Sequence, residues 1–267
     1  MYLSRLILNV RCREVRRDLA DCHDLHRTIL RGFPDLPPTG VTIGDARARL
    51  GVLFRMESHP RTGAASVLVQ SVAEPDWSRL PDGYLLDTRG APPNPDRKTI
   101  DGAYSAIRVG DELVFRLRAN PTKRLPPSTG ADGVRRDGKR VELRTEEELV
   151  RWLGEKGTGN TVTGRPGLGY RLVTVRARPG LASRGPGEAS TAVADARARS
   201  VGKVVGQALR PAEGGAARRE RMTFGDVLFE GRLVVTDADL FRRTLEQGIG
   251  SGKAYGFGLL SVARAPA

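Results

Sequence analysis

The sequence contains few of the residues that cross-link, metal-bound or membrane-embedded proteins depend on. Its two cysteines, Cys12 and Cys22, permit at most one disulfide. No apolar run approaches the roughly 18 residues that a membrane-spanning helix needs, and Arg5 interrupts the N-terminal apolar stretch before a signal-peptide core can form. We therefore expect a reduced, cytoplasmic protein with no membrane segment.

Aromatic and acidic residues are also scarce. The 14 Trp, Tyr and Phe residues make up 5% of the chain and form no cluster typical of RNA-binding strands, which argues against a protein that stacks single-stranded bases. Lysine and arginine number 44 against 31 acidic residues, giving a formal charge of +13 and a pI of about 10.6. This imbalance favours a polyanionic partner, and without a membrane segment nucleic acid is the leading one.

The positive charge is concentrated in two segments that lack a strong apolar pattern. Residues 123–144 contain seven Lys and Arg against three acidic residues, and residues 176–222 contain ten against four. Residues 177–222 are rich in Gly, Ala and Arg, which predicts a mobile insertion. Such segments either grip phosphates or act as solvated linkers.

Apolar periodicity predicts an α+β fold of two tandem ferredoxin-like (RRM-like) βαββαβ domains. The first domain covers residues 1–108. There we expect a strand at residues 2–10, a long helix at 13–31, a hairpin of strands at 51–57 and 65–72, a short helix at 77–80 and a strand at 103–109. The second domain covers residues 109–267. There we expect a strand at residues 112–118, a helix at 145–153, strands at 172–176 and 226–235, a helix at 237–247 and a strand at 259–262.

His26 lies near the middle of the apolar face of the predicted first helix, about 40° around the helix from Cys22. It is either a core histidine or a partly desolvated group that moves a proton in a cleft between the domains. His23, one turn earlier, would then lie at the cleft's edge. Cys22 and His26 have a spacing that suits zinc, but two ligands make no site, so we expect no metal and no cofactor.

A second candidate is the glycine-rich segment 248–258, which has Lys253 at its centre. Its glycines, which allow backbone N–H groups to approach a phosphate, are Gly248, Gly250, Gly252, Gly256 and Gly258. The segment is not a Walker A loop, because Ala254 replaces the required Ser or Thr. It is either a phosphate site or a structural loop.

Four blocks together resemble the CasE family, the CRISPR-associated endoribonucleases of type I-E Cascade. They are MYLSRLIL at the N-terminus, LHR with GFP at residues 25–27 and 32–34, FRLRANP at residues 115–121 followed by Lys123, and GIGSGKAYGFGLLSV at residues 248–262. The blocks extend from one end of the chain to the other, whereas for much of the middle, especially residues 177–222, we place no counterpart.

The resemblance implies tandem ferredoxin-like domains separated by a cleft. It implies a metal-independent enzyme that binds the CRISPR repeat stem-loop, cuts once at its 3′ base to leave a 2′,3′-cyclic phosphate, and stays bound with the other Cascade subunits. The family's catalytic histidine falls on His26, and the usual tyrosine partner is His23 here. That replacement leaves the partner's role open.

Cutting RNA without a metal uses the 2′-hydroxyl as an internal nucleophile, so the protein supplies proton transfer and charge stabilisation. We assign the first to His26, with His23 beside it, and the second to Lys253. An A-form stem hides its base edges, so basic residues should contact its phosphates. The candidates, besides the five glycines, are Arg27, Arg118, Lys123, Arg135, Arg136, Lys139 and Arg140.

Two other functions fit the same residues. One is a subunit of the same fold that holds the RNA hairpin without cutting it, which the change at position 23 makes conceivable. The other is a general basic RNA-binding protein, which would bind unrelated hairpins with similar affinity. A cleavage assay distinguishes the non-cutting subunit from the enzyme. Selectivity for the repeat hairpin distinguishes the enzyme from the general RNA-binding protein.

Overall fold

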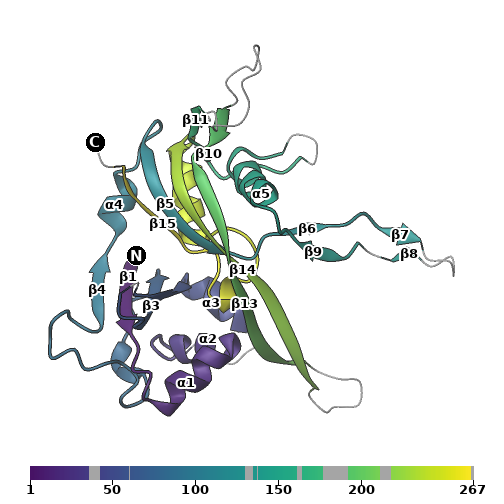
Figure 1. Cartoon of the computed structure of the whole chain (residues 1–267). Coiled ribbons are helices and arrows are strands. Elements are labelled where there is room, and N and C mark those ends of the chain that lie inside the picture. Colours follow the sequence, from purple (N-terminus) through teal and green to yellow (C-terminus); the bar gives the residue numbers. More distant parts are fainter. Residues whose placement is uncertain are drawn as a thin grey trace.

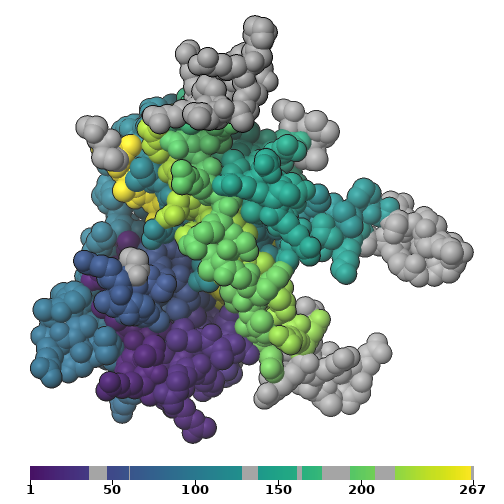
Figure 2. Space-filling model, in the orientation of Figure 1, coloured from purple at the N-terminus to yellow at the C-terminus, as the bar shows by residue number. Residues whose placement is uncertain are grey.

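Two antiparallel sheets form the framework of the protein (Figure 1). The structure is a computed structural model, and it describes residues 1–35, 43–59, 61–129, 135–136, 138–160, 164–176, 192–210 and 218–265. Figure 2 shows the N-terminal half at the lower left and the C-terminal half above and to the right, with two projections leaving the body on one side.

The first sheet has the strand order β2-β3-β1-β4. Its strands are β1 (Tyr2–Ile7), β2 (Leu53–Ser58), β3 (Ala65–Ser71) and β4 (Asp96–Thr99). The helices of this half are α1 (Arg13–Ala20), α2 (Cys22–Leu30), α3 (Ile43–Leu50), the 3-10 turn η1 (Trp77–Arg79) and α4 (Asp101–Ser105). Apolar residues of α1 and α2 pack on those of β1, β2 and β3 to form one core.

The second sheet repeats the order as β10-β14-β5-β15, and β13 pairs with β14 outside this path. Its strands are β5 (Glu112–Ala119), β10 (Tyr170–Leu172), β13 (Ala196–Arg210), β14 (Arg218–Val235) and β15 (Leu260–Arg264). Helices α5 (Glu146–Thr158) and α6 (Ala238–Gln247) cover one face and bury a second core. Each sheet has its first strand between its third and fourth, so the predicted pair of ferredoxin-like domains is confirmed.

Two hairpins project from the second half. One is an arm built from β6 (Thr122–Arg124) with β9 (Arg140–Glu142) and, further out, β7 (Ser128–Thr129) with β8 (Arg135–Arg136). The other is the long hairpin of β13 and β14, which extends past α2 in Figure 1. The remaining elements are β11 (Thr174–Arg176), β12 (Ala192–Ala194) and the 3-10 turn η2 (Lys253–Tyr255).

Three sequence expectations need correction. The single helix predicted at residues 13–31 is broken at Asp21, whose extended backbone lets its carboxylate accept from His23 N and cap α2. The strand predicted at residues 103–109 is wrong, because the fourth strand is the earlier β4 and residues 101–105 are helical. All four side chains of β4 are exposed, so it carries no apolar alternation that periodicity can detect.

The third correction concerns the insertion predicted at residues 177–222. Residues 196–210 and 218–222 are strand, because they pair along almost the full length of the β13–β14 hairpin. This pairing rests on the backbone ladder between the two strands, and Ala196 and Ala198 pack against the second core. Residues 177–191 and 211–217 lie outside the described part of the chain.

Candidate functional site

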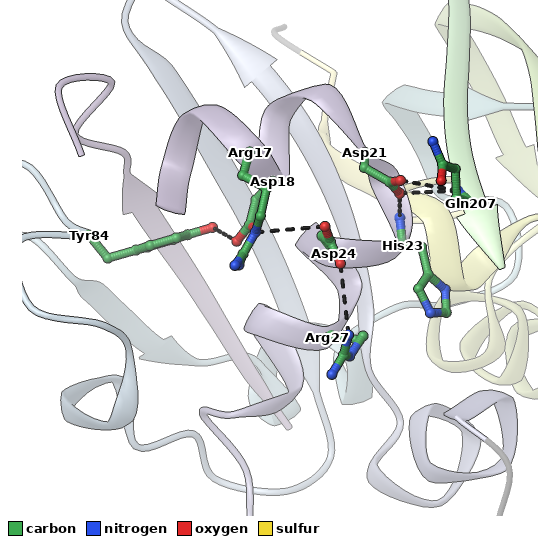
Figure 3. Close-up of polar contacts among 8 residues, drawn as sticks. All are labelled: Arg17, Asp18, Asp21, His23, Asp24, Arg27, Tyr84 and Gln207. Atoms are coloured by element: carbon green, nitrogen blue, oxygen red, sulfur yellow. Dashed lines mark hydrogen bonds and ion pairs between the residues drawn. The ribbon is translucent and has the colours of Figure 1, made fainter. Parts of the chain in front are cut away.

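Helix α2 carries both candidate histidines and is fixed at its N-terminus by the long hairpin. Asp21 accepts a hydrogen bond from His23 N at 2.9 Å, and its other carboxylate oxygen accepts from Gln207 N of β13 at 3.1 Å (Figure 3). A side chain at Gly206 would lie 2.6 Å from Cys22 Sγ, so only glycine permits this approach. The projecting hairpin is therefore coupled mechanically to the helix that carries His23 and His26.

His26 is completely buried, with 0% of its surface exposed. Its ring lies parallel to the ring of Phe54 on β2, with centroids 6.1 Å apart and planes 15° apart. Leu25 and Ile29, on either side of it along α2, belong to the first core. The prediction that His26 lies on the apolar face is correct, and its imidazole meets strand β2 there.

His23 lies nearer the surface than His26. Its side chain is half-buried, and its ring faces Tyr255 of η2 with centroids 6.4 Å apart. Within the described residues its Nδ1 atom is buried and has no hydrogen-bond partner. A buried imidazole nitrogen without a partner is costly, so this position favours a proton donor or acceptor supplied from outside the chain.

The turn η2 brings Lys253 to the same place, because it contacts both α2 and β2. Burial lowers the pKa of Lys253, and the neighbouring cations Arg47 and Lys156 lower it further. None of these three cations forms an ion pair with a carboxylate of the described residues. Two such cations beside the half-buried ammonium of Lys253 favour binding of an anion.

The glycine-rich segment is folded tightly on itself. Its five predicted glycines all have positive φ, between 75° and 89°. The Ile249 N–H donates to Gly258 O at 2.9 Å, and the Gly258 N–H donates to Arg118 O at 2.8 Å, so neither group is available to a phosphate. A side chain at Gly256 would press on the Phe54 ring at 3.2 Å. These glycines build the turn that presents Lys253 and Tyr255.

The structure brings together some of the predicted RNA-binding residues. Lys123, Lys139 and Arg140 are exposed on the arm, although Lys123 Nζ pairs with Glu148 at 2.9 Å. Arg135 and Arg136 are on β8, but their side chains lie outside the described part. Arg27 is 62% exposed on α2, where its Nη1 atom lies 3.9 Å from Asp24 (Figure 3).

Arg118 differs from the other predicted RNA-binding residues, because it is only 17% exposed. Its guanidinium binds both carboxylate oxygens of the buried Asp226, and its Nη1 atom donates to Met56 O at 3.1 Å. These contacts tie the second sheet to β2. We therefore assign Arg118 to the interface between the domains rather than to the RNA surface.

Sequence reasoning missed four residues around the candidate site: Phe54 and Tyr255 beside the histidines, Phe224 beside Tyr255, and the cation Arg47 near Lys253. Tyr255 lies two residues after Lys253, so its place in the glycine-rich segment was a usable signal. Phe54 and Phe224 lie on strands far from α2 in sequence, and no local pattern marks them. Only the fold places them beside the candidate site.

Cys22 and His26, the pair whose spacing suits zinc, lie one turn apart on α2, and both are buried. Burial raises the pKa of the Cys22 thiol to about 12. No group of three or more His, Cys, Asp or Glu side chains with metal-binding geometry occurs among the described residues. In the same part of the chain, no helix is long and apolar enough to cross a membrane.

Comparison with known proteins agrees with this fold. The family described as CRISPR associated protein matches residues 1–264, and the chain belongs to this family. The CRISPR-associated endoribonuclease Cse3 of Thermus thermophilus is 34% identical over 266 residues, which cover 98% of this chain and 100% of that protein. The CRISPR system Cascade subunit CasE of Escherichia coli is 28% identical over 98% of this chain and 99% of that subunit.

A solved structure of CRISPR endoribonuclease Cse3 bound to a 19-nucleotide RNA is also similar. It has a TM-score of 0.64 and 32% sequence identity, covering 98% of this chain and 100% of that one. The resemblance to the CasE family is therefore confirmed along the whole chain.

Proposed function

We propose that the chain is an endoribonuclease that binds the stem-loop of a CRISPR repeat in precursor RNA and cuts once at the 3′ base of the stem. The observation that carries the proposal is the contact of α2, which carries His23 and His26, with η2, which carries the half-buried Lys253. The full-length similarity to a CRISPR endoribonuclease supports it. Because a related chain is a Cascade subunit, we expect this chain to belong to that complex, and we expect it to keep the product bound.

The proposed reaction needs no metal, because the RNA supplies its own nucleophile. The 2′-hydroxyl loses its proton and attacks the adjacent phosphorus, and the 5′-oxygen of the next nucleotide leaves with a proton. The products are a 2′,3′-cyclic phosphate and a 5′-hydroxyl end. His26 transfers one of these protons, His23 lies at the entrance, and Lys253 stabilises the extra charge on the phosphate. His26 is buried in the unbound chain, so RNA binding must expose its ring.

The arm and the long hairpin supply the proposed RNA surface. Both project on the same side of the molecule in Figure 2. Arg197, Arg199 and Arg221 are exposed on the hairpin and form no ion pair with a described carboxylate. Because an A-form stem is recognised through its shape and phosphates, two basic projections suit it better than a flat sheet.

We also propose that the boundary between the domains lies near residue 108. The last strand of the first sheet ends at Thr99, and the first strand of the second sheet begins at Glu112. The catalytic helix α2 then belongs to domain 1–108. The glycine-rich segment belongs to domain 109–267, so the active site forms only where the two meet.

A cleavage assay tests the proposed function. Purified protein is mixed with end-labelled CRISPR-repeat hairpins in excess EDTA, and a hairpin with 2′-deoxyribose at the cut site serves as control. We expect one cut at the 3′ base of the stem and none in the deoxy substrate. Cutting that needs added divalent metal, or that persists in the deoxy substrate, would contradict the mechanism.

The full burial of His26 favours a second candidate function, a subunit that holds the hairpin without cutting it. Such a protein would bind repeat hairpins tightly, and no repeat tested would be cut. A general basic RNA-binding protein would instead bind unrelated hairpins equally well. Binding to both repeat and scrambled hairpins is therefore measured alongside cleavage.

Reversing charge on the arm is expected to weaken hairpin binding. In a variant with Arg135, Arg136 and Lys139 replaced by Glu, affinity should fall and the slope of log Kd against log salt should decrease by about three, one per lost phosphate contact. A matched variant reverses the exposed cations Arg61, Lys98 and Arg264 and thus has the same net charge. Equal affinities and equal salt slopes for the two variants would show that the arm is not part of the RNA site.

Replacing His23 with tyrosine is expected to preserve cutting. The side chain is half-buried and faces Tyr255 at the edge of the site, so a phenol can occupy this position and donate or accept a proton. Single-turnover cleavage rates of His23→Tyr and His23→Ala are compared. A folded His23→Tyr protein that binds RNA but does not cut would show that the imidazole has a role that a phenol cannot fill.

A further inference from the structure

Three half-buried aromatic rings form a row that begins on α2, one turn from His26. His23 of α2 faces Tyr255 of η2, and Tyr255 stacks on Phe224 of β14 with centroids 4.9 Å apart and planes 28° apart. The far end of the row is fixed by the buried Phe257, 6.0 Å from Phe224. The three rings of the row come from three separate elements and from both domains.

The row has the properties of a stacking surface rather than of ordinary core packing. The chain has only 14 aromatic residues, and most of its phenylalanines are fully buried in the two cores. These three rings instead retain exposed surface, and His23 lies one turn from the candidate catalytic His26 on α2. Left-handed backbone at Gly252 and Gly256 brackets η2 and sets the position of Tyr255.

Positive charge lies next to the row. Lys253 is two residues from Tyr255 in the same turn, and Arg47 and Lys156 lie close enough to lower its pKa. An aromatic face beside a cluster of cations matches the two parts of one nucleotide, a base and its phosphate. Base pairs inside a stem do not offer their faces, so the ligand is an unpaired nucleotide next to the stem.

We propose that Tyr255 and Phe224, together with His23, form a stacking platform for the nucleobase immediately 3′ of the scissile phosphate. Stacking that base holds the phosphate between Lys253 and His26. Tyr255 and Phe224 are thus positioning residues, which act on the reaction through the RNA. The platform's role in cutting rests on the proposed endoribonuclease function.

Fluorescence of 2-aminopurine tests the platform independently of cleavage. The fluorophore is placed immediately 3′ of the cut site in a repeat hairpin with 2′-deoxyribose at that site, so that the RNA stays whole. Stacking on an aromatic ring should quench it when the wild-type protein binds. We expect Phe224→Leu and Tyr255→Leu to lose most of this quenching and Tyr255→Phe to retain it. The matched control Tyr2→Leu, which removes a half-buried ring from β1, should also retain it.

Single-turnover cleavage gives the second readout. Phe224→Leu and Tyr255→Leu should cut about 10-fold more slowly at saturating protein, in the range that one lost base stack provides. An abasic nucleotide at the same position should slow the wild type equally and slow the two Leu variants no further. This substrate test needs no variant to fold.

The outcomes separate the two proposals. Unchanged quenching in the folded Leu variants, or an abasic substrate cut at the full wild-type rate, would overturn the platform while leaving the endoribonuclease function intact. If the wild type cuts no repeat hairpin, the endoribonuclease function and the platform's part in cutting fail, whereas quenching lost in the Leu variants would still show that the rings bind a base.

Discussion

Replacing His26 with alanine is expected to lower the single-turnover cleavage rate by about 10² to 10⁴-fold, the usual contribution of a general acid or base. Binding of the hairpin should change little, because the buried ring lies on the apolar side of α2, away from the exposed cations of the arm and hairpin. The measurements are the cleavage rate and the Kd for a 2′-deoxy hairpin that cannot be cut.

The matched control is His59→Ala. His59 is exposed in the turn between β2 and β3, and its Nδ1 atom accepts only a 3.3 Å hydrogen bond from Thr62 N. Removing it should leave both cleavage and binding unchanged. A comparable loss of activity in both variants would indicate general destabilisation.

Because His26→Ala also leaves a cavity against Phe54, its thermal stability must be compared with that of the wild type. Added imidazole distinguishes loss of the proton-transfer group from loss of packing in the His26→Ala variant. A free imidazole molecule can occupy the space left by the side chain and transfer the proton. Partial recovery of cutting with imidazole is expected. Wild-type activity in the folded alanine variant would instead show that His26 is only a core residue.

Local periodicity was enough to predict much of this fold. The alternating strand at residues 112–118 and the amphipathic helix at residues 237–247 match β5 and α6 closely, because one face of each is buried and the other is not. Asp237, the first residue of that predicted helix, caps α6 and accepts from Leu240 N at 2.9 Å. Elements whose burial alternates in step with their geometry can be read directly from the chain.

Elements whose structure depends on distant partners could not be predicted. Strand β4 consists of four exposed side chains, and only its pairing with β1 makes it a strand. The long hairpin lacks large apolar residues over much of β13, and its pairing with β14 defines it. Periodicity detects burial of side chains, whereas these strands depend mainly on backbone hydrogen bonds.

Some residues of the candidate site could likewise be predicted from the sequence, and others could not. His26 was found because a polar group on an apolar stripe is unusual, and Lys253 was found because glycines surround it. Tyr255 and Phe224 meet through the tertiary fold, 31 residues apart in sequence and more than 200 residues after His23. The low aromatic content argued against base stacking, but it says nothing about whether the few aromatic residues gather at one place.

Arg55 links the two domains through the strand that supports His26. Its guanidinium is buried, with 3% of the side chain exposed. Its Nη1 atom donates to Arg116 O at 3.0 Å and to Leu259 O at 3.1 Å, both in the second domain, while its Nε and Nη2 atoms bind Glu57. The preceding residue, Phe54, stacks on His26. Successive side chains of β2 thus contact helix α2 and the second domain in turn.

Replacing Arg55 with methionine is therefore expected to lower the free energy of unfolding by about 3–5 kcal/mol, because two main-chain carbonyls and the Glu57 carboxylate lose a buried charged donor. Cleavage should also fall, since the second domain would no longer hold β2 behind His26. Urea unfolding followed by two spectroscopic probes measures the change. Arg55→Lys keeps the charge but not the forked geometry of the guanidinium. Its free energy of unfolding should therefore lie between those of Arg55→Met and the wild type.

The control for Arg55 is Arg5→Met on β1. Arg5 is 44% exposed and forms one ion pair with Asp96 across the sheet, so its loss should cost at most about 1 kcal/mol. Burial lowers the pKa of Arg55, which reflects the cost of keeping its charge away from water. If the cost of burying the guanidinium charge offsets the hydrogen bonds of Arg55, Arg55→Met will be as stable as Arg5→Met. The contacts of Arg55 between the domains would then contribute no net stability. Normal stability with slow cutting would instead show that Arg55 serves to align β2 with the active site.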